Sequence, residues 1–437
     1  MTAFRPHRRS VLGASALAAM GLLAACSTST TGKSGGSDGG GAGGGQNTMW
    51  YWPEGFDEKI ISAVQEKFPE AGFSQVIQGG DFKQKLQTTL QAKSGLPAIT
   101  GIKGEDIAFF KSVPEYFVDL NTLGAEDKKG EYLDWKWEQA TTTDGKQLGI
   151  PIDIGPTALF YRFDVFEEAG LPADPTELGE AITEWDALFE MGKKLQEKDS
   201  ETYLLRNLAG VFDYARRQSG KAFIDESGTF IGAEEHVRHA WDLAVSAHEM
   251  GINAALDSNT ADTAAMVASG KLPADFGASW HLADLIVDAP DTSGKWHVTT
   301  HPGEATNQGG SFLGIPEGGT EDPELALEII FEILSAQNLA TEYTHSGNFP
   351  ANIGSFDTPE VTGEVEFLGG QVASEVFSAA AEHVRPLFED SRDGTVGAPF
   401  WAQLTEVEAS GKDPETAWND AVKEATRLAE QNGVKVD

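Results

Sequence analysis

The chain is poor in cysteine and in basic residues. Its 437 residues contain one cysteine, Cys26, so no disulfide can form within the chain. Lysine and arginine together number 32, against 68 aspartates and glutamates, which gives a formal net charge of −36. So acidic a surface repels phosphate backbones and anionic lipid heads. The composition therefore argues against nucleic-acid binding and against membrane adhesion through a basic patch.

Histidine is sparse as well, and the patterns of common enzymes are missing. The pair His236 and His239 is the candidate for zinc, and we interpret it as solvated helix surface. A serine nucleophile needs Gly-x-Ser-x-Gly, and the run at 309–314 departs from that spacing by one residue. Glycoside hydrolysis needs a pair of carboxylates, but any chain with 68 acidic residues could supply one, so their abundance does not indicate a hydrolase. We therefore expect no catalytic residue, no metal site and no cofactor.

The lone cysteine ends a segment typical of an export signal. A basic stretch with three arginines precedes the apolar run 11–23, which is short for a membrane span and leads into Leu-Ala-Ala-Cys. This pattern resembles a bacterial lipobox, and it predicts a signal peptide at 1–25 and a lipid on Cys26. The pair Arg8-Arg9 also resembles a twin-arginine signal, so the export route stays open.

Residues 26–46 consist almost entirely of serine, threonine and glycine, a composition that predicts a flexible tether. After it, predicted strands at 48–52, 73–77 and 97–102 alternate with amphipathic helices. This alternation favours an α/β fold with parallel strands, whose carboxyl ends carry the ligand-facing loops. The predicted loop residues there are Trp52, Glu54, Asp81 and Glu105.

The segment at 149–172, GIPIDIGPTALFYRFDVFEEAGLP, predicts a crossing between two lobes. Extended segments at 147–153 and 157–162 are joined through a Gly-Pro pair, which lets the backbone change direction, and a short helix follows with Asp164 at its N-cap. A chain of 437 residues is also longer than one hydrophobic core normally holds, which favours two lobes.

Beyond this crossing the chain is predicted to be mostly helical. Strands are expected again at 272–278, 296–300 and 311–315, and a hairpin is expected at 223–231. The apolar run 325–334 predicts a buried helix, since it is far too short to cross a bilayer.

The crossing segment resembles that of the sugar-type (family 1) extracellular solute-binding proteins of ABC importers, the maltose-binding protein group. Further pieces in the expected order are LPAITGIKGEDIAFF (96–110), DFGASWHLADL (275–285) and GGSFLGIPEGGTEDPELALEIIFEILSA (309–336). The resemblance implies a two-lobed periplasmic-binding-protein fold of class II, with interleaved lobes joined by hinge segments. The implied lobes are 47–152 with 313–349, and 153–312 with 350–437.

The same resemblance implies a ligand site between the lobes. Sugar rings stack on aromatic side chains and their hydroxyls need polar partners in the same site. Relatives place a stacking aromatic where this chain has Trp280, followed by His281, and the crossings contribute Asp153, Gly310 and Ser311. With Trp52, Glu54, Asp81 and Glu105 these form the predicted ligand-binding set.

The function implied is that of a monomeric, lipid-anchored protein outside the cytoplasmic membrane. It would capture a carbohydrate, most simply an oligosaccharide, and deliver it to the transmembrane subunits of an ABC permease. Two alternatives stay open: a binding protein for another small solute, such as a polyol, an amino-sugar or a peptide, and a secreted hydrolase acting on glycans.

Overall fold

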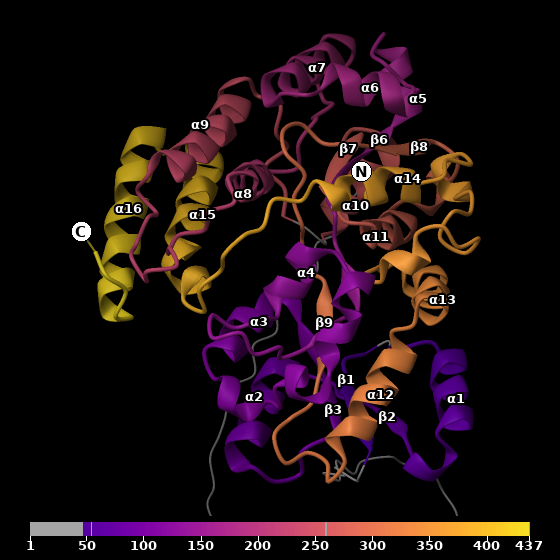
Figure 1. Cartoon of the computed structure of the whole chain (residues 1–437). Coiled ribbons are helices and arrows are strands. Elements are labelled where there is room, and N and C mark those ends of the chain that lie inside the picture. The colour runs from indigo at the N-terminus through magenta and orange to yellow at the C-terminus, as the bar shows by residue number, and fades with distance from the viewer. Residues whose placement is uncertain (1–46, 54, 258–259, 437) are drawn as a thin grey trace, which may run out of the picture. The chain divides into compact units, whose positions relative to one another are not determined.

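The computed structural model describes residues 47–53, 55–257 and 260–436 (Figure 1). The predicted signal peptide, Cys26, the tether and Glu54 lie outside these residues. Among the described helices, none combines the length and the apolar character that crossing a membrane requires.

The first sheet contains five strands in the order β2-β1-β3-β9-β4. Their bounds are Ser74–Ile77 for β2, Thr48–Tyr51 for β1, Ile99–Lys103 for β3, Ser311–Gly314 for β9 and Ile150–Pro151 for β4. β1 pairs in parallel with β2 and β3, whereas β9 is antiparallel to β3 and β4. The three predicted strands at the start of this region are therefore confirmed, as is their parallel direction.

Alternating side chains of β1 explain how helices cover both faces of this sheet. Met49 and Tyr51 belong to a core that includes α1 (Glu58–Lys67) and α12 (Pro323–Ile333), and α12 confirms the predicted buried helix. Trp50 points to the other face, where it packs with α2 (Phe82–Ala92) and α3 (Gly104–Lys111) (Figure 1). This is the period of two that a strand buried on both faces requires.

The second sheet has the order β7-β6-β8 and is antiparallel throughout. Its strands are β7 (Ala274–Gly277), β6 (Ala158–Arg162) and β8 (Trp296–Thr299). Leu159 and Tyr161 of β6 pack into a largely helical core. Phe160 points to the other face and belongs to the same core as Met49 and Tyr51 of β1. The strands expected at 157–162, 272–278 and 296–300 are confirmed, with ends shifted by one to two residues.

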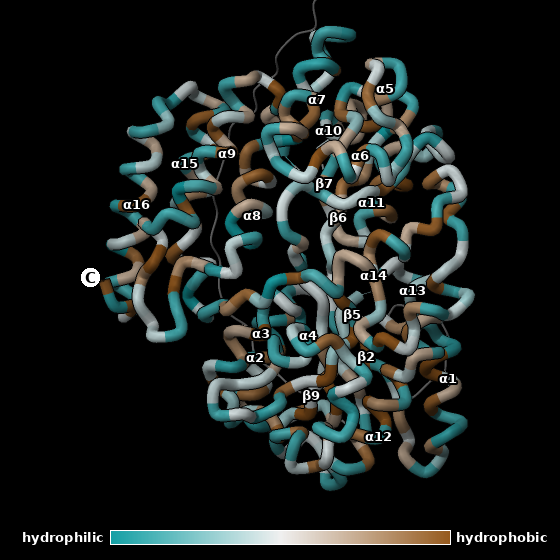
Figure 2. Tube along the Cα trace, turned by 45° about the horizontal axis from the view of Figure 1, so that its top comes forward, coloured by the Kyte–Doolittle hydropathy of each residue, from teal (hydrophilic) through white to brown (hydrophobic). Residues whose placement is uncertain are grey.

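Most of the described helices belong to the part of the chain that contains or follows the second sheet. They include α5 (Phe163–Glu168), α6 (Pro175–Ala181), α7 (Trp185–Lys198), α8 (Leu208–Gln218), α9 (Glu235–Glu249), α10 (Ala261–Ser269), α11 (His281–Asp288), α14 (Ser374–Glu382), α15 (Asp393–Ser410) and α16 (Pro414–Gln431). Figure 2 shows hydrophobic and hydrophilic residues alternating along α16, as expected for a helix with one buried face. The predicted hairpin is confirmed by the antiparallel bridge between Ile224 and Phe230.

Short strands lie where the chain passes between the two sheets. β5 (Asp153–Ile154) pairs with β10 (Phe349–Pro350), and the amide of Ile152 donates to the carbonyl of Ser311 at 2.8 Å. Nearby are α4 (Asp134–Gln139) and α13 (Ala336–Ser346). β9 begins at Ser311, so the lobe boundary predicted between 312 and 313 falls inside this strand. The lobe ranges themselves stay a prediction.

Short 3-10 helices complete the chain at Pro69–Ala71, Pro114–Tyr116, Leu120–Leu123, Ala125–Glu131, Pro290–Thr292, Ile353–Ser355 and Glu366–Leu368.

Two local predictions were wrong. Asp164 does not cap α5: the N-cap is Arg162, and the Asp164 carboxylate in the first turn accepts two hydrogen bonds from the Arg162 guanidinium, at 2.8 and 2.7 Å. His236 is not solvated surface, since its side chain is only 8% exposed and its Nε2 lies 2.9 Å from the carbonyl oxygen of Ala222. In both places the side chain is held by a hydrogen-bond partner, Arg162 for Asp164 and the Ala222 carbonyl for His236, which the spacing of residues in the sequence did not reveal.

Candidate functional site

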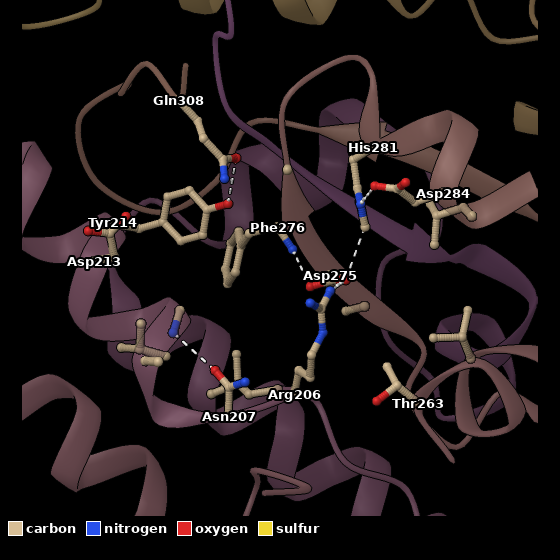
Figure 3. Close-up of a pocket in the computed structure, with 18 of the residues that line it drawn as sticks. Arg206, Asn207, Asp213, Tyr214, Thr263, Asp275, Phe276, His281, Asp284 and Gln308 are labelled. Carbon is tan, nitrogen blue, oxygen red and sulfur yellow. Dashed lines mark hydrogen bonds and ion pairs between the residues drawn. The ribbon is translucent and has the colours of Figure 1, made fainter. Parts of the chain in front are cut away.

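A pocket of about 350 Å³ opens beside the second sheet, between β7, α8, α10 and α11 (Figure 3). One part of its lining is apolar or aromatic and another part is polar. The lining includes Arg206, Asn207, Asp213, Tyr214, Asp275, Phe276, Trp280, His281, Asp284, Asp288 and Gln308.

A row of ionisable side chains forms one wall of this pocket. Asp275 of β7 forms an ion pair with Arg206, and its Oδ2 also lies 3.0 Å from His281 Nε2. The other ring nitrogen of His281 lies 3.2 Å from a carboxylate oxygen of Asp284, so the imidazole stands between two acids (Figure 3). Burial lowers the pKa of Arg206, and Tyr214 and the acids on α11 oppose that shift. The arginine stays charged because its pKa in water is far above neutrality.

Aromatic side chains form a second wall. The rings of Tyr214 and Phe276 lie 5.3 Å apart between centroids, and Trp185 lies 5.4 Å behind Phe276. Burial raises the pKa of Tyr214, so its hydroxyl stays protonated and donates to Gln308 Oε1 at 3.3 Å (Figure 3). Burial also lowers the pKa of the neighbouring His301 to about 4, which keeps that ring neutral at ordinary pH.

Trp280 joins the pocket to the crossing between the sheets. It is the N-cap residue of α11 and is half-buried. Its indole lies against Gly155, where an added Cβ would overlap both the ring and the carbonyl oxygen of Gln308, and it is in contact distance of Gly309. The structure thus brings the predicted residues Trp280 and His281 into one pocket. Their part in ligand binding stays a prediction.

A second group of predicted residues gathers around a buried lysine. Lys136 of α4 is 0% exposed, its Nζ donates to Gln139 Oε1 at 2.9 Å, and it lies 4.1 Å from the centre of the Phe312 ring. Burial lowers the pKa of Lys136 to about 7, while the carboxylate of Asp153 opposes this shift most strongly.

Asp153, Gly310 and Ser311 surround this lysine. Burial raises the pKa of Asp153, against the charge of Lys136 and hydrogen bonds from Ser311. Gly310 has φ of +78°, and an added Cβ there would press on Lys136 Nζ and lie 2.6 Å from the carbonyl oxygen of Asp153. The structure therefore gives these residues partners within the chain, and none of them lines the pocket.

The remaining predicted residues lie at the edge of the first sheet. Trp52 stacks on Tyr51 with 3.8 Å between ring centroids. The Asp81 side chain caps α2 by accepting from the amide of Gln84 at 3.0 Å. Glu105 is 65% exposed, with a carboxylate oxygen 4.0 Å from Lys103 Nζ. None of the three lines the pocket, so the structure separates them from Trp280 and His281.

Several lining residues were missed by sequence reasoning. Asp275 and Phe276 lie in the piece DFGASWHLADL, which carries the family resemblance. Asp284 and Asp288 follow His281 at intervals of three and four residues, and this helical spacing could have identified both acids as neighbours of His281. Arg206, Asn207, Tyr214 and Gln308 carry no comparable signal, because they lie in helical or irregular segments far along the chain.

Comparisons with known proteins agree with the fold. A family model for bacterial extracellular solute-binding proteins matches residues 72–368. The chain is 26% identical over 359 residues to the lactose-binding protein of Rhizobium radiobacter. The aligned region covers 76% of this chain and 81% of that protein. The chain is 24% identical over 282 residues to the arabinooligosaccharide-binding protein of Halalkalibacterium halodurans, covering 62% of this chain and 57% of that protein.

A solved structure of an extracellular solute-binding protein of family 1 matches with a TM-score of 0.83 at 25% identity, over 88% of this chain and 99% of that chain. The family and the two-lobed α/β fold predicted from the sequence are thereby confirmed. The family match spans well over half of the residues. This chain belongs to the bacterial extracellular solute-binding protein family.

Proposed function

We propose that this protein is the substrate-binding lipoprotein of an ABC importer, which captures an oligosaccharide between two lobes and passes it to a membrane permease. The pocket, whose lining residues all belong to the proposed second lobe, would be the part of the site that this lobe contributes. The observation that carries the proposal is the pocket, where aromatic rings and polar groups stand side by side. Trp280, Tyr214 and Phe276 offer faces for the apolar side of a sugar ring. Asp275 and Gln308 offer oxygens to its hydroxyls.

The similarity to proteins named for lactose and arabinooligosaccharide binding supports a carbohydrate ligand. We propose a binding role and no catalysis for this pocket. Asp275 is held by Arg206 and His281, which gives this carboxylate a structural partner on each side.

The test is calorimetric titration of the mature protein with lactose, galactobiose, arabinooligosaccharides and maltooligosaccharides, with polyols, amino-sugars and short peptides alongside. Binding of at least one neutral sugar, with its chain length unchanged after incubation, supports the proposal. Binding of a peptide or polyol alone would refute the carbohydrate assignment, and a shortened sugar would favour the hydrolase.

The two lobes, proposed as 47–152 with 313–349 and 153–312 with 350–437, should close on the ligand. Binding between lobes favours the closed state by its differential affinity for that state. Small-angle scattering at saturating sugar should show a smaller radius of gyration than the free protein. An unchanged radius with demonstrated binding would contradict a hinge.

We propose that a lipid on Cys26 anchors the protein outside the cytoplasmic membrane, and, as a separate proposal, that the protein is a monomer. Replacement of Cys26 with alanine should release the protein from the membrane fraction or leave it unprocessed. A variant that still sediments with membranes at the processed size would exclude the lipid anchor.

A further inference from the structure

The charges that line the pocket are unbalanced, and α11 is the source of the imbalance. His281, Asp284 and Asp288 follow one another at intervals of three and four residues, so they share one face of this helix, and all three line the pocket. Figure 3 shows Asp284 and His281 on the wall opposite Tyr214 and Gln308.

Arg206 is the one lysine or arginine that lines the pocket among the described residues. Its charge is already offset, because Arg206 pairs with Asp275 and both side chains are mostly buried, at 19% and 12% exposure. Asp213, another acid of the lining, is matched by Arg216 and Arg217 at 3.0 and 2.9 Å. Asp284 and Asp288 are left as the acids that no lysine or arginine of the lining pairs with, and Asp284 has His281 as its lining partner, at 3.2 Å.

The field of these two acids reaches into the pocket. Burial lowers the pKa of Arg206, and the carboxylates of Asp284 and Asp288 both act against that shift. A ligand lying beside Arg206 is therefore within reach of the same two carboxylates, while the charge of Arg206 itself is offset by Asp275. An anionic ligand would have to give up its water without gaining an unpaired cation, which is the costliest way to bury a charge.

We propose that this pocket selects sugars by charge: it accepts neutral units, accepts units with a protonated amine at least as well, and rejects sugar acids such as uronates, with Asp284 and Asp288 as the selecting residues. This inference rests on the proposed carbohydrate-binding function. Discrimination by repulsion is an ordinary route to specificity.

The test uses three forms of one disaccharide. The neutral parent is whichever of lactose, galactobiose or maltose binds most tightly, and the other two forms carry a carboxylate or an amine at C6 of its terminal hexose. By calorimetry at low ionic strength, we expect the uronate to bind at least about tenfold more weakly than the parent, and the amine at least as tightly. The gap should narrow as salt is raised.

The selecting residues are tested with the double variant Asp284→Asn/Asp288→Asn. The ratio of the dissociation constants for uronate and parent should fall severalfold in this variant. The matched control is Asp291→Asn, which removes a negative charge from an exposed position next to α11 and outside the pocket lining, and it should keep the wild-type ratio.

The outcomes distinguish failure of charge selection from failure of carbohydrate binding. If the parent sugar binds and the uronate binds equally well, charge selection is refuted while the carbohydrate-binding function stands. If the wild-type ratio persists in the double variant, or if the amine binds much more weakly than the parent, the assignment to Asp284 and Asp288 is refuted. If no neutral sugar binds, the proposed function fails and the inference fails with it.

Discussion

Replacing Lys136 with methionine should change how stability depends on pH. Methionine keeps most of the stem that packs near the Phe312 ring and removes the charge. In the folded protein burial lowers the pKa of Lys136 from 10.5 to about 7. Between these two pH values the unfolded chain binds a proton that the folded protein does not, so the free energy of unfolding rises with pH.

The size of this rise follows from the two pKa values. Each pH unit contributes at most about 1.4 kcal/mol, and the half-titrated start near pH 7 reduces the total gain between pH 7 and pH 9 to about 2 kcal/mol. Burial also lowers the pKa of Lys111, so that lysine adds a rise of the same sign to the wild type and to the variants alike, and the effect of Lys136 is the difference between them. Burial lowers the pKa of His301 to about 4, and burial raises the pKa of Asp393 to about 7, so Asp393 adds only a small opposite change at the lower limit.

Urea unfolding at pH 7, 8 and 9, followed by tryptophan fluorescence and circular dichroism, measures the effect. The gain in unfolding free energy across this range should be smaller by about 2 kcal/mol in Lys136→Met than in the wild type, because the amine of residue 136 is no longer there to titrate. Lys59→Met removes an exposed lysine of α1 and should keep the wild-type gain. An equal gain in the wild type and in Lys136→Met would refute the assignment of the rise to Lys136.

Three other changes test the site. Trp280→Ala should weaken sugar binding by about 2 kcal/mol or more in calorimetry, as truncation of a central stacking ring does, and unchanged affinity in a stable variant would remove Trp280 from the site. Gly155→Ala should lower stability in urea by about 1 to 3 kcal/mol, because its Cβ would overlap Trp280 and Gln308; a variant as stable as the wild type would contradict that close packing. Asp275→Asn should cost about 3 kcal/mol of unfolding free energy by leaving the mostly buried Arg206 without its counter-charge, and a loss below about 1 kcal/mol would show the pair to be screened.

Local patterns predicted the strands and helices well. Met49 and Tyr51 share one face of β1 and Trp50 faces the other way, as the period of two requires. The same local patterns could have corrected one site prediction. Asp81 followed three residues later by Gln84 is a helix-start signature, and the structure shows Asp81 as the cap of α2.

The pocket could not be predicted in the same way, because it depends on contacts between distant segments. Arg206 and Asp275 are close only because the loop before α8 lies beside β7. In the sequence Arg206 is one more charged residue in a helical region. Lys136 is similar, because its neighbours in the sequence give no sign that a lysine would be fully buried. Contacts with distant residues explain its place: the backbone at Gly310, the ring of Phe312 and the carboxylate of Asp153.

The crossing between the sheets links the pocket to the proposed hinge. At Gly155 and Gly310 the missing side chains let backbone segments touch, so the crossing strands pack against one another without a layer of side chains between them. Trp280 rests directly on Gly155. A sugar stacked on that indole would therefore act on a segment that joins the sheets, and no intervening chain of contacts is needed to couple binding to closure. Lys136 lies against Gly310 at the start of the neighbouring crossing segment, so the residues that surround the buried lysine lie next to the segment on which Trp280 rests.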